Sequence, residues 1–145
     1  MREALALPTR KSEAWRYADL DALAALLPLP EAERVVVAAG ESFNRAVVQA
    51  SGVTRLDLVL EKGARAAVHV LNSGEGYARV ELDVSLHEGA DFTLGGAQLG
   101  TGTANLEIVA TVTHLEPNAS SRQTVRSVLA AQAVGTCLGK VAVAN

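Results

Sequence analysis

Cysteine, histidine and aromatic residues are scarce in this sequence of 145 residues. It contains one cysteine, Cys137, three histidines, one tryptophan, two tyrosines and two phenylalanines. A single thiol excludes a framework of disulfide bonds and fits a reducing compartment, so we expect a cytoplasmic protein. A chain of this length buries enough of its own surface to fold without disulfides or a structural metal.

None of the short motifs that mark common catalytic sites is present. No HExxH, CxxC, GxSxG or GxxxxGKT pattern occurs, and the histidines lie far in sequence from carboxylate clusters and from Cys137. The glycine-rich segment 94–105 is followed by neither a lysine nor a helix-forming stretch, so it predicts turns and edge strands rather than a phosphate loop. We therefore expect no catalytic residues, no bound metal and a protein that is not an enzyme. The histidines are His69, His87 and His114.

The sequence has no excess of basic charge and no long apolar run. Thirteen Lys and Arg residues stand against 16 Asp and Glu residues, which gives a formal net charge of −3 and argues against nucleic-acid binding. The longest apolar run, residues 22–27, is far shorter than a membrane span. The first ten residues carry an early Glu3 and no sustained apolar stretch. We expect no membrane span and no signal peptide.

Small aliphatic residues in short alternating runs dominate the rest of the chain. Apolar residues make up 49% of the sequence and are mostly Ala, Val and Leu, which suits a narrow core. Apolar and polar residues alternate over 80–87, Glu88 and Gly89 turn the chain, and the alternation resumes over 90–94. This pattern predicts two half-buried strands joined by a tight corner. Similar runs from Val35 onward predict β-strands.

This corner occurs three times. LEKGA begins at Leu60, LHEGA at Leu86 and LEPNA at Leu115, at intervals of 26 and 29 residues. Each copy is predicted to place a leucine inward and then Gly or Asn at positive φ, which both residue types tolerate. Self-similarity at this period indicates a repeat, and coils of this length predict a right-handed parallel β-helix, or β-solenoid. A β-sandwich or jelly roll with similar hairpin corners is the alternative.

One predicted strand is apolar on both faces. Between Leu106 and Leu115, Ile108 and Val112 belong to one alternating set and Val109 to the other. Either a bulge flips the register or the strand is covered on both faces.

The first 34 residues differ from the remainder. Asp19 is a good N-cap residue, and the apolar residues after it recur at helical spacing until Pro28. We therefore expect a short helical lead and linker over 1–34 and a partial, incomplete β-solenoid over 35–145. The helical positions are Leu20, Leu23, Ala24 and Leu27.

Two separated segments carry motifs that resemble those of a known family. The first motif consists of Leu7, Pro8, Thr9, Arg10, Lys11, Glu13, Trp15, Tyr17 and Leu20. The second consists of Ser121, Arg122, Gln123, Val128, Leu129, Gly135, Gly139, Lys140 and Val141. Both resemble the SufB/SufD family of the SUF iron–sulfur cluster assembly system, and the first closely resembles the N-terminal signature of SufD proteins.

The resemblance implies a right-handed parallel β-helix core and a scaffold function. In this family SufB and SufD form a paralogous pair, each joined to the ATPase SufC, and the complex assembles nascent iron–sulfur clusters. By resemblance, this chain is a SufD-like subunit that pairs with a SufB-like paralogue and a SufC-like ATPase. The cluster is then handled by the full complex, with no cofactor bound by this chain alone.

The chain departs from the family by ending at Asn145, whereas family members continue into further coils and a C-terminal helical region that contacts the ATPase. We therefore expect a chain truncated before its C-terminal part, with the ATPase contact outside it. An uncapped last coil has free backbone groups, so we expect a homo-oligomer in isolation.

Cys137 is the one candidate cofactor ligand, since a soft sulfur suits iron. With no second Cys or His within ten residues, a small buried core residue is the favoured interpretation. His114 with Glu116 suggests a metal pair, although a hydrogen-bonded turn histidine is favoured. The alternative function is a small-molecule or metal-binding β-barrel of the cupin type, and the sequence lacks the histidine cluster that such a site requires.

Overall fold

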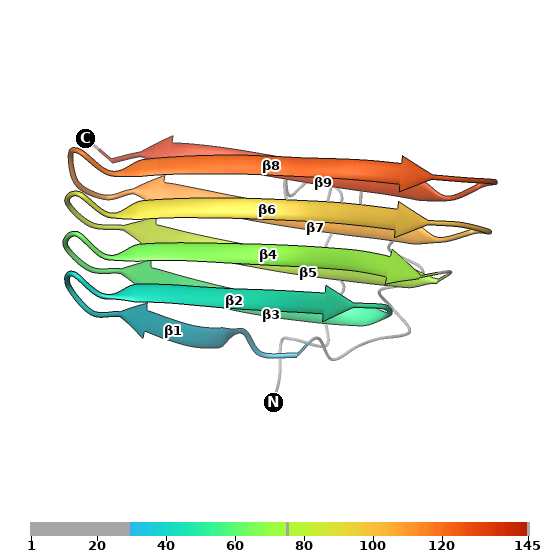
Figure 1. The fold of residues 1–145 in the computed structure, drawn as a ribbon, viewed down its shortest axis with the longest axis horizontal. Helices are drawn as coiled ribbons and strands as arrows, with labels where there is room; N and C mark the ends of the chain where they lie inside the picture. The colour runs from blue at the N-terminus through green and yellow to red at the C-terminus, as the bar shows by residue number, and fades with distance from the viewer. Residues whose placement is uncertain (1–29, 75, 145) are drawn as a thin grey trace, which may run out of the picture.

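The computed structural model describes residues 30–74 and 76–144, which form nine β-strands in two sheets (Figure 1). The five-stranded sheet has the order β1-β3-β5-β7-β9, and the four-stranded sheet has the order β2-β4-β6-β8. Every pair of neighbouring strands is parallel. The strands are β1 (Glu33–Val37), β2 (Ser42–Gln49), β3 (Gly52–Leu60), β4 (Arg65–Gly74), β5 (Tyr77–Leu86), β6 (Asp91–Gly100), β7 (Asn105–His114), β8 (Ser120–Leu129) and β9 (Val134–Val143).

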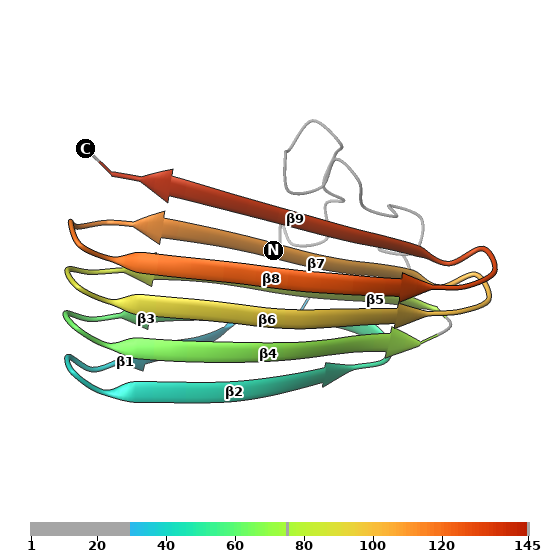
Figure 2. The ribbon, with the colours of Figure 1, turned by 45° about the horizontal axis from the view of Figure 1, so that its top comes forward.

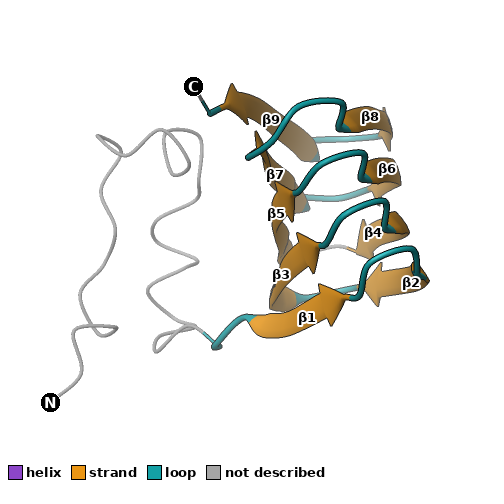
Figure 3. Ribbon diagram, turned by 90° about the vertical axis from the view of Figure 1, so that its left-hand side faces the viewer, coloured by secondary structure: helices purple, strands orange, loops and turns teal. Residues whose placement is uncertain are grey.

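The chain alternates between the two sheets and rises by one coil each time it returns. Each odd-numbered strand leads through a corner into the next even-numbered strand of the opposite sheet (Figure 2). The end view in Figure 3 shows the two sheets facing each other, with the corners stacked above one another. The predicted parallel β-solenoid is therefore confirmed, with about four turns. Parallel pairing rules out the sandwich, jelly-roll and cupin-type alternatives, whose strands pair antiparallel.

The alternation predicted over 80–94 produces the core between the sheets. Val80, Leu82 and Val84 are fully or nearly fully buried, and so are Phe92 and Leu94 on the opposite sheet. Because successive coils are in register, each buried residue packs on the equivalent residue of its neighbouring coils.

The repeated corners have the predicted backbone. Gly63, Gly89 and Asn118 have φ of 69°, 69° and 66°, so asparagine does replace glycine at a left-handed position. A fourth corner, with Gly40 at φ 73°, precedes them. The pattern in the sequence did not reveal this corner, because Val37 and Glu41 stand where the other copies have leucine and alanine.

The predicted inward position of Leu115 is wrong. Leu86 pairs with His114 rather than with Leu115, whereas Asp91 pairs with Ser120, so this third corner contains one additional residue. Leu115 is consequently 40% exposed in the corner. His114 occupies the core-facing position and is half-buried.

Strand β7 is covered on both faces without a bulge. Its register with β5 and β9 is continuous over the whole strand. Leu106, Ile108 and Val112 are buried on the inner face, and Glu107 and Val109 are buried on the outer face. Of the two explanations for the apolar pattern, the structure therefore selects coverage of both faces.

The turn between β8 and β9 contains an alanine in a strained conformation. Ala131 has φ 57° and takes the place that Gly102, with φ 63°, has in the preceding coil. Substituting Ala131→Gly should raise the free energy of unfolding by about 0.5–1 kcal/mol, because relief of the left-handed strain outweighs the added chain entropy. Chemical denaturation would measure this gain. Ala130→Gly is the control, and a comparable gain there would contradict the explanation.

Several expectations fall on residues that the structure does not describe. They are the helix predicted between Asp19 and Pro28 and the whole first motif, Leu7 to Leu20. Among the described residues, no helix is long and apolar enough to cross a membrane.

Candidate functional site

The second motif lies in the last coil, where its residues divide between the interior and two outer faces. Ser121 and Gln123 are at core-facing positions of β8, and Gly139 is at a core-facing position of β9. Arg122 and Lys140 are at outward positions of opposite sheets. The structure therefore does not bring these five residues into one site.

Contacts across the interior of the last coil explain three of the motif residues. A Cβ atom at Gly139 would lie 2.9 Å from Oε1 of Gln123, so a larger residue here would displace the end of this flexible side chain. Oγ of Ser121 lies 3.0 Å from Nε2 of His114 on β7. These contacts indicate that Ser121, Gln123 and Gly139 have a packing role.

Cys137 is exposed, which corrects the expectation of a buried core residue. Cys137 nevertheless lies at a core-facing position of β9, because it pairs with the buried Ile108 of β7. Burial in a solenoid requires a coil on each side, and within the described residues β9 has a neighbouring strand on one side only. Partial burial raises the pKa of the Cys137 thiol, which favours the protonated sulfur over the thiolate that binds metals. The ligand role of Cys137 stays a hypothesis.

The three histidines lie apart from one another. His69 is exposed on the outer face of β4, and His114 contacts β8. His87 connects three successive corners, with Nδ1 2.6 Å from Oε1 of Glu116 and Nε2 3.7 Å from Oε2 of Glu61. This hydrogen bond is the main cause that lowers the pKa of Glu116. Glu116 thus pairs with His87 rather than with His114, and no group of three or more metal-ligating side chains forms among the described residues.

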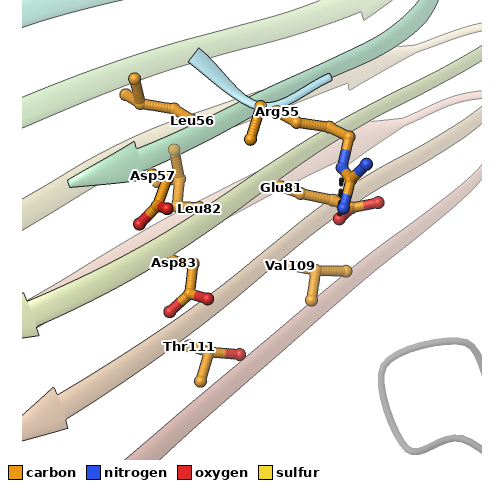
Figure 4. Close-up of a pocket in the computed structure, with 9 residues that line it drawn as sticks. Arg55, Leu56, Asp57, Glu81, Leu82, Asp83, Val109 and Thr111 are labelled. Atoms are coloured by element: carbon orange, nitrogen blue, oxygen red, sulfur yellow. Dashed lines mark ion pairs between the residues drawn. The ribbon is translucent and has the colours of Figure 1, made fainter. Parts of the chain in front are cut away.

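A hollow of about 290 Å³ lies on the outer face of the five-stranded sheet (Figure 4). Strands β3, β5 and β7 provide most of its walls. Figure 4 shows Arg55 with Glu81 on one side and the carboxylates of Asp57 and Asp83 on the other. Sequence reasoning missed this set, because alternation along a strand assigns each residue to the surface without showing which of them share a depression. The lining residues are Ala32, Arg55, Leu56, Asp57, Glu81, Leu82, Asp83, Val109 and Thr111.

The hollow has mixed charge with an acidic side. Arg55 Nε lies 3.4 Å from Glu81 Oε1, and Arg34 Nη1 lies 3.3 Å from Asp57 Oδ2. Asp57 and Asp83 are register partners on neighbouring strands, so their side chains leave the sheet side by side. Burial, and to a smaller degree the charge of Asp57, raises the pKa of Asp83.

A buried ionic network adjoins this hollow. Glu107 Oε1 accepts hydrogen bonds from the Tyr77 hydroxyl and from Arg79 Nη1, both at 2.7 Å. Arg79 Nε donates to Glu81 Oε2 at 2.9 Å, which joins the network to the hollow. The side chains of Arg79 and Glu107 are each only 1% exposed. Burial and the hydrogen bond to Glu107 raise the pKa of Tyr77, which keeps this phenol protonated.

Substituting Asp83→Asn should stabilise the protein at neutral pH. Because the folded-state pKa of Asp83 is raised, its ionisation disfavours folding as the pH rises through that pKa. We expect a rise in Tm of roughly 1–3 °C at pH 7, kept small by solvent screening, and no difference near pH 3, where the carboxyl is protonated in both states. Thermal unfolding at both pH values measures this effect.

The control for this prediction is Asp91→Asn on the other sheet. The Asp91 carboxylate accepts a hydrogen bond from the Ser120 hydroxyl at 2.8 Å, and the substitution would weaken this contact. This variant should not gain stability at neutral pH. An equal gain in both variants would show that net charge, rather than the environment of Asp83, sets the effect.

The described residues provide exposed strand faces, a shallow hollow and packed ion pairs. The residues that line the hollow include neither a histidine nor a cysteine, and their one arginine, Arg55, is paired with Glu81. Such a rigid solenoid can present side chains to a partner along its faces and at its ends.

Comparison with known proteins identifies the chain. No curated protein and no solved structure matches it. The family described as "SUF system FeS cluster assembly, SufBD core domain" matches residues 34–145, which include every strand from β2 to β9. The chain therefore belongs to the SufBD core domain family of the SUF system for iron–sulfur cluster assembly.

Proposed function

We propose that this chain is a SufD-like scaffold subunit, acting in the cytoplasm without catalysis of its own. The observation that carries the proposal is the SufBD core domain match over residues 34–145. The choice of SufD over SufB rests on the resemblance of the motif between Leu7 and Leu20 to the N-terminal signature of SufD proteins.

The two ends of the solenoid differ in a way that supports pairing through the last coil. At the first coil Arg45 occupies a core-facing position and makes two hydrogen bonds, of 3.0 and 2.9 Å, to the Glu33 carboxylate. Its guanidinium lies 5.3 Å from the centre of the Phe43 ring, so a charged pair covers this end. At the last coil Val141 and Val143 are core-facing but 55% and 70% exposed. Among the described residues, the last coil is therefore the end with more exposed apolar surface, which favours it as the contact for a partner strand.

In this proposal the last coil pairs with a SufB-like paralogue and, in isolation, with a second copy of this chain. The SufC-like ATPase joins through a part of the complex outside the described residues. The iron–sulfur cluster is the cargo of the full complex, and this chain alone holds no cofactor.

Co-purification tests the proposal. The tagged chain is co-expressed with the SufB-like and SufC-like proteins of its own source, beside the double variant Val141→Asp, Val143→Asp and the control Val36→Asp on an outer face. We expect the original chain and the control to retain the SufB-like protein and the double variant to lose it. Failure of the original chain to retain the SufB-like protein would overturn the proposed pairing and leave only the family membership.

A further inference from the structure

The outer face of the four-stranded sheet carries an apolar stripe, with one large aliphatic residue on each strand. Val48 is 75% exposed, Leu71 37%, Leu99 44% and Val128 67%, and they belong to β2, β4, β6 and β8, respectively. Val48 and Leu71 are register partners. Leu99 and Val128 are also register partners and lie two residues further along the strands. The four residues therefore form a continuous patch near the ends of the strands, on the sheet opposite the hollow.

Small residues, the exposed His69 and two arginines surround the apolar stripe. The outward positions next to it hold small residues, among them Ala46, Ala67, Gly95 and Ala97. Arg126 lies in the row of Val48 and Leu71, and Arg122 lies on the same strand. Neither arginine forms an ion pair with another described residue.

At the outward strand positions that the structure describes on this face, acidic charge is confined to a distant row. Asp91 is the single carboxylate at the outward positions of these four strands, and it lies at the opposite end of β6 from Leu99 and binds Ser120. The chain as a whole has a net charge of −3, whereas the outward positions of this face carry more basic than acidic residues. An exposed apolar patch bordered by charge of one sign is typical of a protein-binding surface.

We propose that the apolar stripe and its arginines form a docking surface for an acidic amphipathic segment of a partner protein. Neighbouring strands lie about 4.8 Å apart, so four strands span about 14 Å, which equals roughly ten residues of α-helix. A helix laid across the strands would place its apolar face on the stripe and its carboxylates beside Arg122 and Arg126. This surface is the outer face of a sheet, whereas the pairing surface proposed above is the open end of the last coil; the two share only strand β8, and the inference does not rest on the proposed function.

Two other occupants fit the surface less well. A second copy bound through the same face would itself present more basic than acidic residues, so it lacks the carboxylates that would complement Arg122 and Arg126. An anionic membrane would match the arginines, but interfacial binding needs a large apolar area, often with Trp or Phe, and this face offers four aliphatic side chains without an aromatic residue.

Peptide binding to the full chain tests the proposal. The probe is a fluorescently labelled helical peptide of about 20 residues, a length at which isolated helices form, with leucine along one face and glutamate elsewhere. We expect binding that weakens as salt is added, and no binding of a matched peptide with lysine in place of glutamate. Fluorescence anisotropy measures both affinities.

Surface variants locate the binding site. The double variant Val48→Glu, Val128→Glu and the single variant Arg126→Glu should each lower the affinity by roughly tenfold or more. Asn44→Glu, on the same face but four residues from Val48 along β2, is the matched control and should bind as the original chain does. Arg126→Ala provides a milder second test if a charge reversal disturbs the fold, which circular dichroism monitors.

Three results would overturn the proposal. One is equal binding of the glutamate and lysine peptides, and another is unchanged affinity in both surface variants. The third is the discovery that the stripe serves another occupant: self-association that Val48→Glu, Val128→Glu abolishes, or binding to vesicles of anionic lipid without binding to the peptide.

Discussion

Substituting Glu107→Ala is expected to lower the free energy of unfolding by about 3–5 kcal/mol. The guanidinium of Arg79 stays buried and keeps its bond to Glu81, but it loses the carboxylate that lies 2.7 Å from its Nη1, and the Tyr77 hydroxyl loses its acceptor. A charge left in a buried site without this partner is far more costly than the loss of a surface pair. Domains of this size have total stabilities of about 5–15 kcal/mol, so the variant should be close to unfolding. Urea denaturation followed by circular dichroism measures the change.

Two further variants separate the cost of the buried charge from other effects. Glu88→Ala removes a carboxylate from an exposed pair with Lys62, at 3.4 Å, and should cost less than about 1 kcal/mol. The double variant Arg79→Met, Glu107→Leu replaces both charges with apolar groups and should recover most of the lost stability. If Glu107→Ala is as mild as Glu88→Ala, the buried pair contributes little and the explanation is wrong.

The architecture could be predicted because it depends on local features that repeat. Alternation over 80–94 and the positive-φ positions at Gly89 and Asn118 together specify a strand, a corner and a strand in the opposite sheet. Stacking of such units buries one face of each strand, so the period favours a solenoid, while parallel pairing in the structure is what excludes the sandwich. The structure confirms these elements.

The errors arise where burial depends on something other than the strand's own pattern. Leu115 was assigned inward because its corner resembles the others, and one additional residue moves His114 into that position instead. Cys137 does lie at a core-facing position, but its burial depends on a neighbouring coil rather than on its own strand. Parity predicts which way a side chain points, whereas exposure depends on what covers it.

The ionic network illustrates the same limit on the outer face. Arg79 and Glu107 alternate with apolar residues, so parity assigns them to solvent, yet both are buried. One signal was available, because Val109 makes β7 apolar on both faces and so indicates coverage of the outer face near Glu107. The hollow had no comparable signal, since its residues come from three strands and their grouping appears only when the sheet is assembled.

Substituting Phe92→Ala is expected to lower the free energy of unfolding by about 3–5 kcal/mol. Phe92 is fully buried, and its column through the stack alternates between large and small residues: Phe43, Ala66, Phe92 and Ser121. The small neighbours in the coils on both sides make room for the ring. They cannot fill the cavity that the substitution leaves, so the cost should approach the upper end of this range. Thermal and chemical denaturation measure the loss.

The column supplies both a matched control and a rescue variant. Phe43→Ala makes the same change at the first coil, where the ring is only half-buried, and should cost about 1–2 kcal/mol. The double variant Phe92→Ala, Ala66→Phe moves the ring by one coil at constant core volume and should recover roughly 1–2 kcal/mol relative to Phe92→Ala. A cost for Phe92→Ala no larger than that for Phe43→Ala would contradict the argument. That result would mean that the coils move together to close the cavity. The stack would then be more deformable than the continuous pairing of β4, β6 and β8 indicates.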